Sequence, residues 1–461
     1  MGSLDIDDRL LLRWATPKDL EELPDTVVDV FSSPNLRLTS LGIQFQRTTS
    51  GESGLMTSKD CIVVVDKIDP KEPVVAFASY WQEQHIYEGI PYNVGRPAWV
   101  GVKNDPQYRG KRLQQHILDE LHRRSKQDGT LVQVVNGINY YYRQFGYDYA
   151  IEYGQRTKTW LQSIPILKDG QVEPLTYRHA RMDDIDKILD FDKARNQGCA
   201  VFLPMSRAWI TAQLKEFATK SVDESYFLTR QVLMFEDSGG KTVGFFIIWG
   251  LEDEMCDDII SVYHMGFAPE IDIPAVILSA MRNAIAFVKT QVDETRFARF
   301  TSIGWHMSQW HPVAQAVPSH MRIPATMPYD EDFAYYVRVT DLHAFLQHIL
   351  PALNRRLKES PLHSNHTGSV RLSNYSAKFP GFELEIKNGE ICKVSGFVKR
   401  DQTHDPDLAC FPPHTFLQIL FGRKSIDDLK YIFPDVAMSE EIQKLLDVLF
   451  PKKISIIHHY M

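Results

Sequence analysis

Cysteine is scarce in this 461-residue chain, and no two cysteines are closely spaced. The five are Cys61, Cys199, Cys256, Cys392 and Cys410, an odd number without a CxxC pair. This spacing argues against a disulfide framework and against a zinc knuckle, and it favours a reducing compartment. We therefore expect a cytoplasmic protein without a bound metal.

The chain also lacks concentrated positive charge and long apolar runs. Its formal net charge is −8, its isoelectric point is near 6.1, and it has no block of five like charges. A nucleic-acid-binding face needs clustered basic residues, so we expect no nucleic-acid partner. No apolar run is long enough to span a membrane, and the acidic start "MGSLDIDDRLLLRW" is unlike a secretory signal.

A short pattern occurs twice. The composition, 44% hydrophobic and 24% charged residues, is typical of a folded protein with room for about three domains. The segments "LRWATPKDLEEL" and "YRHARMDDIDKI" each predict a strand, a turn and a helix, and each is followed by two apolar strands around a turn. Three positions match at equal spacing, namely Arg13, Ala15 and Asp19 in the first and Arg178, Ala180 and Asp184 in the second. The chain is therefore predicted to contain one α/β unit twice.

The remaining sequence has a different texture. The segment "GFELEIKNGEICKV" alternates apolar and polar residues around Asn388-Gly389, which predicts a tight hairpin. Several short helices follow, one of them after Ser425 and another after Ser439. We therefore expect a third unit and divide the chain into residues 1–165, 166–335 and 336–461.

A helix with a basic start follows the strand "AWVGV". Its predicted apolar face consists of Leu113, Ile117, Leu118 and Leu121. The first N–H groups of a helix lack intrahelical partners, and the helix dipole favours anions there. With Arg109, Lys111 and Arg112 nearby, the helix start suits a diphosphate, although an ordinary solvated helix start is the alternative.

The stretch "YRGKRLQ" resembles the [Q/R]-x-x-G-x-[G/A] motif of the GNAT N-acetyltransferases. Arg109 fills the first position, whereas Arg112 and Gln114 occupy the two positions that normally hold small residues, so a Cβ is expected to crowd the phosphate. The resemblance implies acetyl-CoA as co-substrate. N-myristoyltransferases have Arg-x-Lys-Arg-Leu at a similar place, so a longer acyl group is the alternative. The residues implied in cofactor binding are Val100, Val102, Arg109, Gly110, Lys111, Arg112, Leu113, Gln114 and Asn136.

The segment "NGINYYYRQFGYDYAI" is similar to the GNAT pattern Asn-x5-Tyr-x-x-[FL]-Gly-[FY]. Asn136, Tyr142 and Gly146 fall in register with it. The resemblance implies that Asn136 helps to fix pantetheine and that Tyr142 protonates the departing thiolate, a role that a phenol can perform. The alternative is that the aromatic cluster is only core packing, which is our interpretation of the neighbouring tyrosines.

The second copy lacks this motif, because "APEIDIPAVILSAMRN" has no Arg-x-x-Gly element. We interpret it as a degenerate GNAT unit. The segment "GWHMSQWHP" contains His306 and His311, but no acid or cysteine stands at ligand spacing, so a packed aromatic loop is favoured over a metal site.

The order of units resembles the Eis-type (enhanced intracellular survival) acetyltransferases, in which two GNAT units precede a sterol-carrier-protein-like unit. The segments "YYRQFGY" and "LLDVLFP" carry this resemblance. It implies that the carboxylate of Met461 acts as base with Tyr142 as acid, and that the protein forms a homo-oligomer. Glu83 and His85 are alternative bases, and Trp81 and Tyr87 are predicted to line the amine pocket.

The expected fold class is thus α+β or α/β, with two tandem GNAT folds and a sterol-carrier-protein-like α+β domain. The expected activity is acetyl-CoA-dependent N-acetylation of a small-molecule or peptide amine by direct attack on the thioester. Two alternatives remain open, a longer-chain N-acyltransferase and a non-enzymatic lipid-binding or scaffold protein on an inactive GNAT fold.

Overall fold

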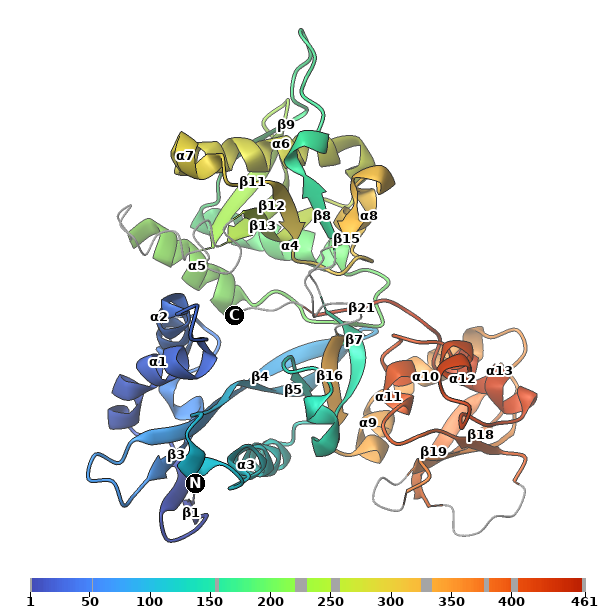
Figure 1. Ribbon diagram of the computed structural model, residues 1–461. Helices are drawn as coiled ribbons and strands as arrows, with labels where there is room; N and C mark the ends of the chain where they lie inside the picture. The colour runs from blue at the N-terminus through green and yellow to red at the C-terminus, as the bar shows by residue number, and fades with distance from the viewer. Residues whose placement is uncertain are drawn as a thin grey trace.

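Three units, each with its own sheet, make up the molecule (Figure 1). The computed structural model describes residues 2–51, 53–153, 157–219, 230–249, 258–324, 334–376, 381–398 and 405–457. The first unit lies at the lower left of Figure 1, the second at the top and the third at the right.

The first unit contains a ten-stranded sheet that combines strands from all parts of the chain. Its helices are α1 (Pro17–Phe31), α2 (Thr39–Thr49) and α3 (Leu113–Gln127). Its strands are β1 (Leu4–Asp5), β2 (Leu10–Trp14), β3 (Cys61–Asp66), β4 (Val74–Tyr87), β5 (Ile90–Val102), β6 (Val132–Val135), β7 (Asp148–Glu152), β10 (Val201–Phe202), β16 (Ala334–Val339) and β21 (Ser455–Ile456).

Part of this sheet closes on itself. β4 pairs with β5, β5 with β6, β6 with β16 and β16 with β7. β7 then pairs with β21, β21 with β10, and β10 returns to β4. Because β10 and β21 come from the second and third units as predicted, the first unit is completed by distant parts of the chain.

The two faces of this ring of strands are buried against different partners. Tyr80 and Tyr336 pack with Ile117 and Leu121 of α3, as the apolar periodicity predicted for that helix. The opposite face contributes to the largest core of the molecule, which continues into the second and third units. Strands covered on both faces lack polar alternation, which explains the fully buried first half of β4.

The second unit repeats the order of elements seen in β2 to β6. Its helices are α4 (Ile185–Arg195), α5 (Arg207–Thr219), α6 (Ile273–Gln291), α7 (Glu294–Phe297) and α8 (Pro312–Ala316). Its strands are β8 (Thr157–Trp160), β9 (Leu175–His179), β11 (Gln231–Asp237), β12 (Thr242–Trp249), β13 (Ile259–Phe267), β14 (Ser302–Trp305) and β15 (Ile323–Pro324).

The repeated arginine and aspartate make the same contact in both units. Arg13 donates through Nη1 and Nη2 to the carboxylate of Asp19 at 2.5 and 3.0 Å. Arg178 does the same with Asp184 at 2.7 and 2.8 Å. Each acid also accepts a hydrogen bond from the backbone N–H three residues before it, which fixes the turn into the helix. The Arg–Asp pattern found in the sequence therefore marks the same strand-to-helix turn in both units.

The helix α6 is long and apolar enough, by length and composition, to cross a membrane. It is the only such helix in the described ranges, and one is weak evidence. One side of α6 is buried in the core of the second unit, where Ile277, Met281, Ala284 and Phe287 are inaccessible or nearly so. This burial accounts for its apolar composition.

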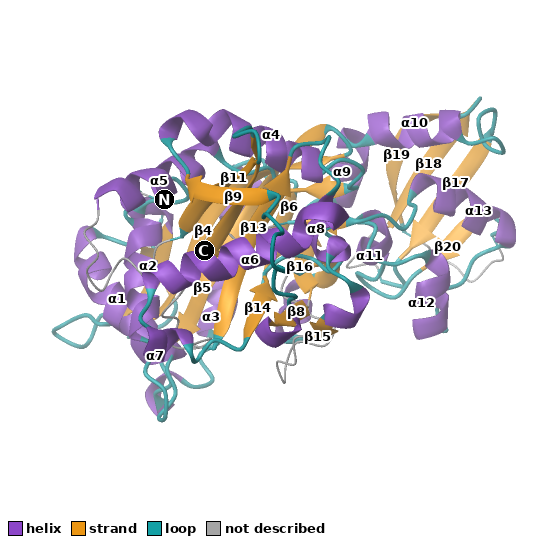
Figure 2. Ribbon diagram, turned by 90° about the horizontal axis from the view of Figure 1, so that it is seen from above, coloured by secondary structure: helices purple, strands orange, loops and turns teal. Residues whose placement is uncertain are grey.

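The third unit has a four-stranded sheet with helices packed against it (Figure 2). The Asn388-Gly389 hairpin is confirmed, since both residues have the positive φ that a tight turn requires. The elements are α9 (Leu342–His348), α10 (Leu350–Glu359), β17 (Gly368–Ser373), β18 (Gly381–Lys387), β19 (Glu390–Phe397), β20 (Leu408–Cys410), α11 (Phe416–Leu420), α12 (Ile426–Ile432) and α13 (Glu440–Leu449).

Two of the predicted domain limits need correction. β8 was assigned to residues 1–165, but it pairs with β14 and β15 in the second sheet. β16 straddles the limit at residues 335 and 336, but it lies between β6 and β7 in the first sheet. Sheets recruit strands to cover exposed edges, and such pairings between distant segments leave no local mark in the sequence.

Candidate active site

The strands β5 and β6 form a fork. They pair in parallel only at Val94 with Val132 and at Gly95 with Gln133. Beyond these pairs β5 stays with β4, while β6 follows β16. A bulge at Trp99, whose φ is 50°, shifts the pairing of β5 with β4. The fork therefore presents backbone groups of β5, among them those of the half-buried Val100 and Val102, to an extended ligand.

The turn between β5 and α3 forms the predicted cradle. Gly110 and Arg112 both adopt the left-handed conformation, with φ values of 76° and 52°. Arg112 is the N-cap of α3, and no side chain of a described residue caps the first turn. Its N–H groups are therefore available to an anion. Arg112 was expected to crowd the phosphate because it has a Cβ where the motif has glycine. In the structure Arg112 adopts the left-handed conformation of a glycine, which costs about 1–2 kcal/mol for a residue with a Cβ.

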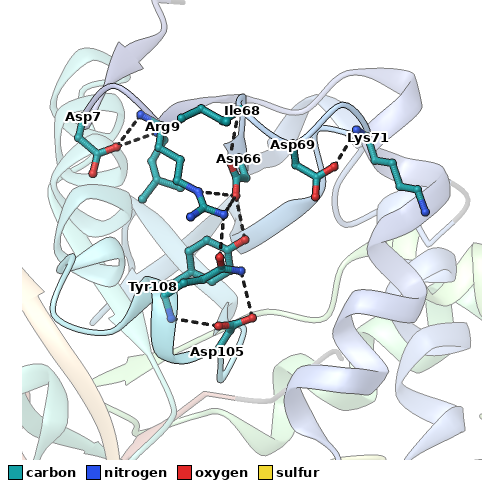
Figure 3. Close-up of polar contacts among 10 residues, drawn as sticks. Asp7, Arg9, Asp66, Ile68, Asp69, Lys71, Asp105 and Tyr108 are labelled. Carbon is teal, nitrogen blue, oxygen red and sulfur yellow. Dashed lines mark hydrogen bonds and ion pairs between the residues drawn. The ribbon is translucent and has the colours of Figure 1, made fainter.

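The base of the cradle is fixed to the sheet by a polar network (Figure 3). Tyr108 donates its hydroxyl to Asp66 at 3.1 Å, and Arg9 donates Nε to the same carboxylate oxygen at 2.7 Å. The hydrogen bond from Arg9 lowers the pKa of Asp66. Asp105 accepts from the backbone N–H of Gln107 at 3.0 Å and holds the turn that leads to the helix.

The predicted cationic residues lie around the helix start and are solvent-exposed. Arg109 donates to Asn104 at 3.0 Å, and Lys111 pairs with Asp7 at 2.8 Å. The hydrogen bond from Lys111 is the main reason why the pKa of Asp7 falls to about 2. Leu113 is different, since its side chain is buried in the core and only its backbone can serve a ligand.

Gln114 links the cradle to the aromatic turn, because its side-chain oxygen accepts a hydrogen bond from the hydroxyl of Tyr141. The adjacent Tyr142 lies over Gly137, where a Cβ would stand 2.7 Å from the ring of Tyr142. Asn136 is half-buried at the end of β6, directly before this glycine. The cradle and Tyr142 are therefore parts of one site at the open end of the fork.

Tyr142 is 4% exposed, and burial raises its pKa above the usual range, with a further contribution from Tyr141. Its hydroxyl makes no hydrogen bond to any described residue. The rings of Tyr141, Tyr147 and Tyr336 surround it, with centroids 5.3, 6.0 and 5.4 Å away. Such a phenol stays protonated at neutral pH and is free to donate to a bound molecule.

Tyr336 was not found from the sequence. Its hydroxyl donates to Ile138 O at 3.0 Å and accepts from the Tyr149 hydroxyl at 2.6 Å, so it holds the backbone that leads to Tyr142. It comes from β16, and only the pairing of β16 with β6 and β7 brings it here. No signal in the local sequence could have identified it.

One known protein family matches the part of the chain that contains this site. Residues 12–150 match the model described as an acetyltransferase (GNAT) domain, and no curated protein matches the chain. This match spans both the cradle and Tyr142.

Solved structures resemble the chain over nearly its whole length. A probable N-acyltransferase from Enterococcus faecalis has a TM-score of 0.62 at 14% identity, covering 98% of this chain and 100% of its own. A GCN5-related N-acetyltransferase from Kribbella flavida scores 0.61 at 16% identity and 98% coverage of both chains. Eis1 from Mycobacterium abscessus scores 0.55 at 13% identity, covering 95% of this chain and 96% of its own. At these identities the likeness shows a shared fold, and it confirms the predicted mixed α/β acyltransferase fold.

Glu83 of the first unit is held by other residues of the protein. Its carboxylate accepts from Trp81 Nε1 at 3.0 Å, from His85 Nε2 at 3.0 Å and from Arg96 Nη1 at 3.3 Å. Burial alone would raise its pKa, but Arg96 and the hydrogen bonds outweigh burial and lower it to about 2. A carboxylate stabilised to this degree is a poor proton acceptor at neutral pH.

The other predicted acceptor-pocket residues have different surroundings. His85 is inaccessible, and burial lowers its pKa. Trp81 is buried beside Arg96, with the guanidinium 5.4 Å from the indole ring centre. Tyr87 donates its hydroxyl to Leu420 O of the third unit at 3.0 Å. This contact joins the first and third units, and the role of Tyr87 in the amine pocket stays a prediction.

Met461 lies outside the described residues, which end at Ile457. The strand before it has a defined direction, because β21 runs parallel to β10, and β10 runs antiparallel to β4. The chain in β21 therefore runs beside β4 in the direction from Tyr87 toward Glu83. The role of the Met461 carboxylate stays a prediction.

Proposed function

We propose that this protein is an acetyl-CoA-dependent N-acetyltransferase that acts on a primary amine. The observation that carries the proposal is the continuity of three features, namely uncapped N–H groups at the start of α3, a fork beside them, and a buried phenol without a hydrogen-bond partner among the described residues at the fork. This order matches the order of diphosphate, pantetheine and thioester along the co-substrate.

The uncapped first turn of α3 would bind the diphosphate, assisted by Arg109, Lys111 and Arg112. Asn136 and the bulged part of β5 would bind the pantetheine amides. The thioester would then lie beside Tyr142. In these assignments, charged side chains bind the co-substrate at the exposed cradle, and backbone groups bind it along the fork.

The amine nitrogen attacks the thioester carbonyl, and the carbon–sulfur bond breaks as the new carbon–nitrogen bond is completed. A base takes the proton that the ammonium group loses before it attacks, and the departing thiolate takes the proton of Tyr142. The second proton of the nitrogen, lost after the attack, passes to the Tyr142 phenolate directly or through solvent and restores the phenol. We assign the base to the carboxylate of Met461, because Glu83 is occupied by Arg96 and His85 is closed off from solvent. The proton reaches bulk solvent from that carboxylate.

A short acyl group is favoured over a long one by the closed end of the fork. A Cβ at Gly95 would overlap the hydroxyl of Tyr80, so this ring fills the face toward α3. Arg96 and Tyr335 fill the opposite face, with the guanidinium 5.1 Å from the tyrosine ring centre. These side chains occupy both faces of the sheet at the paired end of the fork, and we infer a short acyl group from this.

We further infer that the second unit is a GNAT copy without a cofactor site and that the third is sterol-carrier-protein-like. The repeated Arg–Asp turns support the first inference. The second rests on the order of a four-stranded sheet and short helices at the end of the chain.

The experiment is a panel of amines, including polyamines, aminoglycosides, amino acids and lysine peptides, incubated with acetyl-CoA while free thiol is monitored. Thermal-shift titrations with acetyl-CoA and myristoyl-CoA accompany it. We expect stabilisation by acetyl-CoA and thiol release with at least one amine. Stabilisation by myristoyl-CoA alone would favour the longer-chain activity, and stabilisation by neither would contradict the proposal.

A further inference from the structure

A helix of the third unit contacts the strand that follows the turn containing Tyr142. Gln418 lies in α11 and is 5% exposed. Its Nε2 donates to Asp148 Oδ2, at the start of β7, at 3.2 Å. No other described residue donates to this oxygen. Thus a side chain from the third unit satisfies a buried carboxylate of the GNAT domain.

The other oxygen of Asp148 holds the turn itself. Oδ1 accepts from Arg143 Nε at 3.0 Å and from Arg143 Nη2 at 2.7 Å. It also accepts from the backbone N–H of Tyr149 at 2.8 Å. Arg143 directly follows Tyr142 in the short helix Tyr141–Phe145. A chain of contacts therefore leads from Gln418 through Asp148 to the residue beside the phenol.

Burial makes this chain sensitive to the loss of one member. The side chain of Asp148 is inaccessible to solvent, whereas that of Arg143 is 28% exposed. A buried charge that loses a hydrogen-bond donor has no bulk water beside it to take the donor's place. The carboxylate of Asp148 therefore has to move, or the structure around it has to open to let water in. Either change alters the hydrogen bonds between Asp148 Oδ1 and Arg143, and hence the position of the turn that contains Tyr142.

A second contact supports the same direction of influence. Gly146, with φ 89°, ends the turn, and the ring of His414 from the third unit lies 3.9 Å from where its Cβ would stand. The third unit therefore approaches the turn at both Asp148 and Gly146. Neither contact lies on the cradle at the start of α3.

We propose that Gln418 is a positioning residue for the transfer reaction and that the third unit, through it, sets the placement of Tyr142. The inference rests on the proposed function for its kinetic consequence. Gln418 touches neither reactant. Its loss changes the rate of the chemical step and leaves the binding of acetyl-CoA nearly unchanged, because the cradle is anchored separately through Tyr108 and Asp66.

The test compares Gln418→Leu with Gln443→Leu in the full chain. Gln443 is a matched control, because its Nε2 donates to Asp427 at 2.7 Å within the third unit and on the surface. We expect Gln418→Leu to lower kcat about tenfold, since misplacement of a reacting group by an ångström can cost about a hundredfold in rate. The KM for acetyl-CoA is expected to stay within about twofold. The control is expected to match the wild type.

A near-isosteric variant separates positioning from general damage. In Gln418→Glu two carboxylates face each other, and protonation of one at low pH restores a hydrogen bond. The ratio of its kcat to that of the wild type is therefore expected to rise as the pH falls from 8 to 5.5. A ratio that is flat with pH, or a kcat equal to that of the wild type in both variants, would overturn the proposal.

Hydrogen exchange gives a readout that does not need activity. The amides of residues 137–146 are expected to exchange faster in Gln418→Leu than in Gln443→Leu, while those of the first turn of α3 stay unchanged. If the wild type has no transferase activity but exchange is still faster in Gln418→Leu, then Gln418 does position the turn and the proposed function is refuted. Equal exchange in an active enzyme would refute the positioning role alone.

Discussion

The parallel strands β5 and β6 of the first unit and β13 and β14 of the second both diverge, but at different points. β5 and β6 pair at two positions and then diverge. β13 and β14 pair at four positions, and the N–H of His306 donates to Val262 O at 2.9 Å just beyond them. The same order of elements therefore gives strands that separate within β6 in the first unit and only after the last residue of β14 in the second.

The helices that follow the two forks differ in the same sense. α3 begins at Arg112 in a left-handed conformation, with cations at the positive end of the helix dipole. α6 begins at Asp272, has a proline in its first two positions, and has no basic residue in its first turn. The start of α6 is favourable for helix stability, whereas that of α3 is unfavourable until an anion binds. Of these two helix starts, only that of α3 combines a left-handed residue with clustered cations.

Removal of the Tyr142 hydroxyl is expected to have the largest effect. Tyr142→Phe keeps the ring packing against Tyr141, Tyr147 and Tyr336, so the fold and acetyl-CoA affinity are expected to persist. The kcat is expected to fall about a hundredfold or more, because a positioned acid contributes about 10²–10⁴ in rate. Steady-state kinetics and calorimetric titration with acetyl-CoA measure the two quantities.

Tyr140 is the matched control, since it lies two residues earlier and is 71% exposed. Tyr140→Phe should leave kcat unchanged. Because burial raises the pKa of Tyr142, the wild-type kcat should also show no alkaline loss near pH 10, the usual tyrosine value. An unchanged rate in Tyr142→Phe would remove the acid role, and the open fork would then need another explanation.

Local patterns in the sequence were enough to predict the elements that lie close together along the chain. The helix with Leu113 and Ile117, the Asn388-Gly389 turn and the repeated Arg–Asp devices all depend on spacing within a few residues. The ring of strands could not be predicted, because β10, β16 and β21 reach the first sheet from far along the chain. Tyr336 and Gln418 were missed for the same reason.

Glu83 shows how tertiary pairing changes the reading of a side chain. In the sequence, Glu83 at the end of an apolar strand resembled an available base. In the fold it lies two pairs along the β4–β5 hairpin from Arg96, which occupies its carboxylate. The neighbour on β5 is visible in the sequence, but the pairing register that aligns the two residues is set by the turn at Glu88 and Gly89, with the bulge lying beyond Ser79.

Glu83→Gln is expected to destabilise the first unit by about 3–5 kcal/mol at pH 7, because Arg96 would remain as a buried charge without its partner. The pKa of Glu83 is lowered to about 2 from an ordinary 4.5. Its contribution to stability is therefore present above pH 4.5 and is lost as the pH falls toward 2. Urea unfolding at pH 7 and pH 3.5 should show a smaller pH difference in the variant.

Asp192→Asn in the second unit sharpens the contrast between the units. Asp192 is also a buried carboxylate beside an arginine, Arg195, but burial raises its pKa. Its neutral form is therefore less unfavourable, and the amide should cost less stability than Glu83→Gln. Equal losses in the two variants would mean that the two buried pairs are energetically alike.

The smallest expected effect concerns Asp7, an acid beside the cradle. Asp7 pairs with Lys111 at 2.8 Å, and its pKa of about 2 keeps it ionised at neutral pH. Asp7→Asn frees Lys111 for the diphosphate, and we expect acetyl-CoA to bind about twofold more tightly at low salt, since an exposed ion pair is worth little. The gain should vanish at high salt through screening. Asp5→Asn is the control, because Asp5 pairs at 2.6 Å with Lys67, away from the helix start. Weaker binding in Asp7→Asn would instead mean that the Asp7–Lys111 pair holds the cradle in its binding shape.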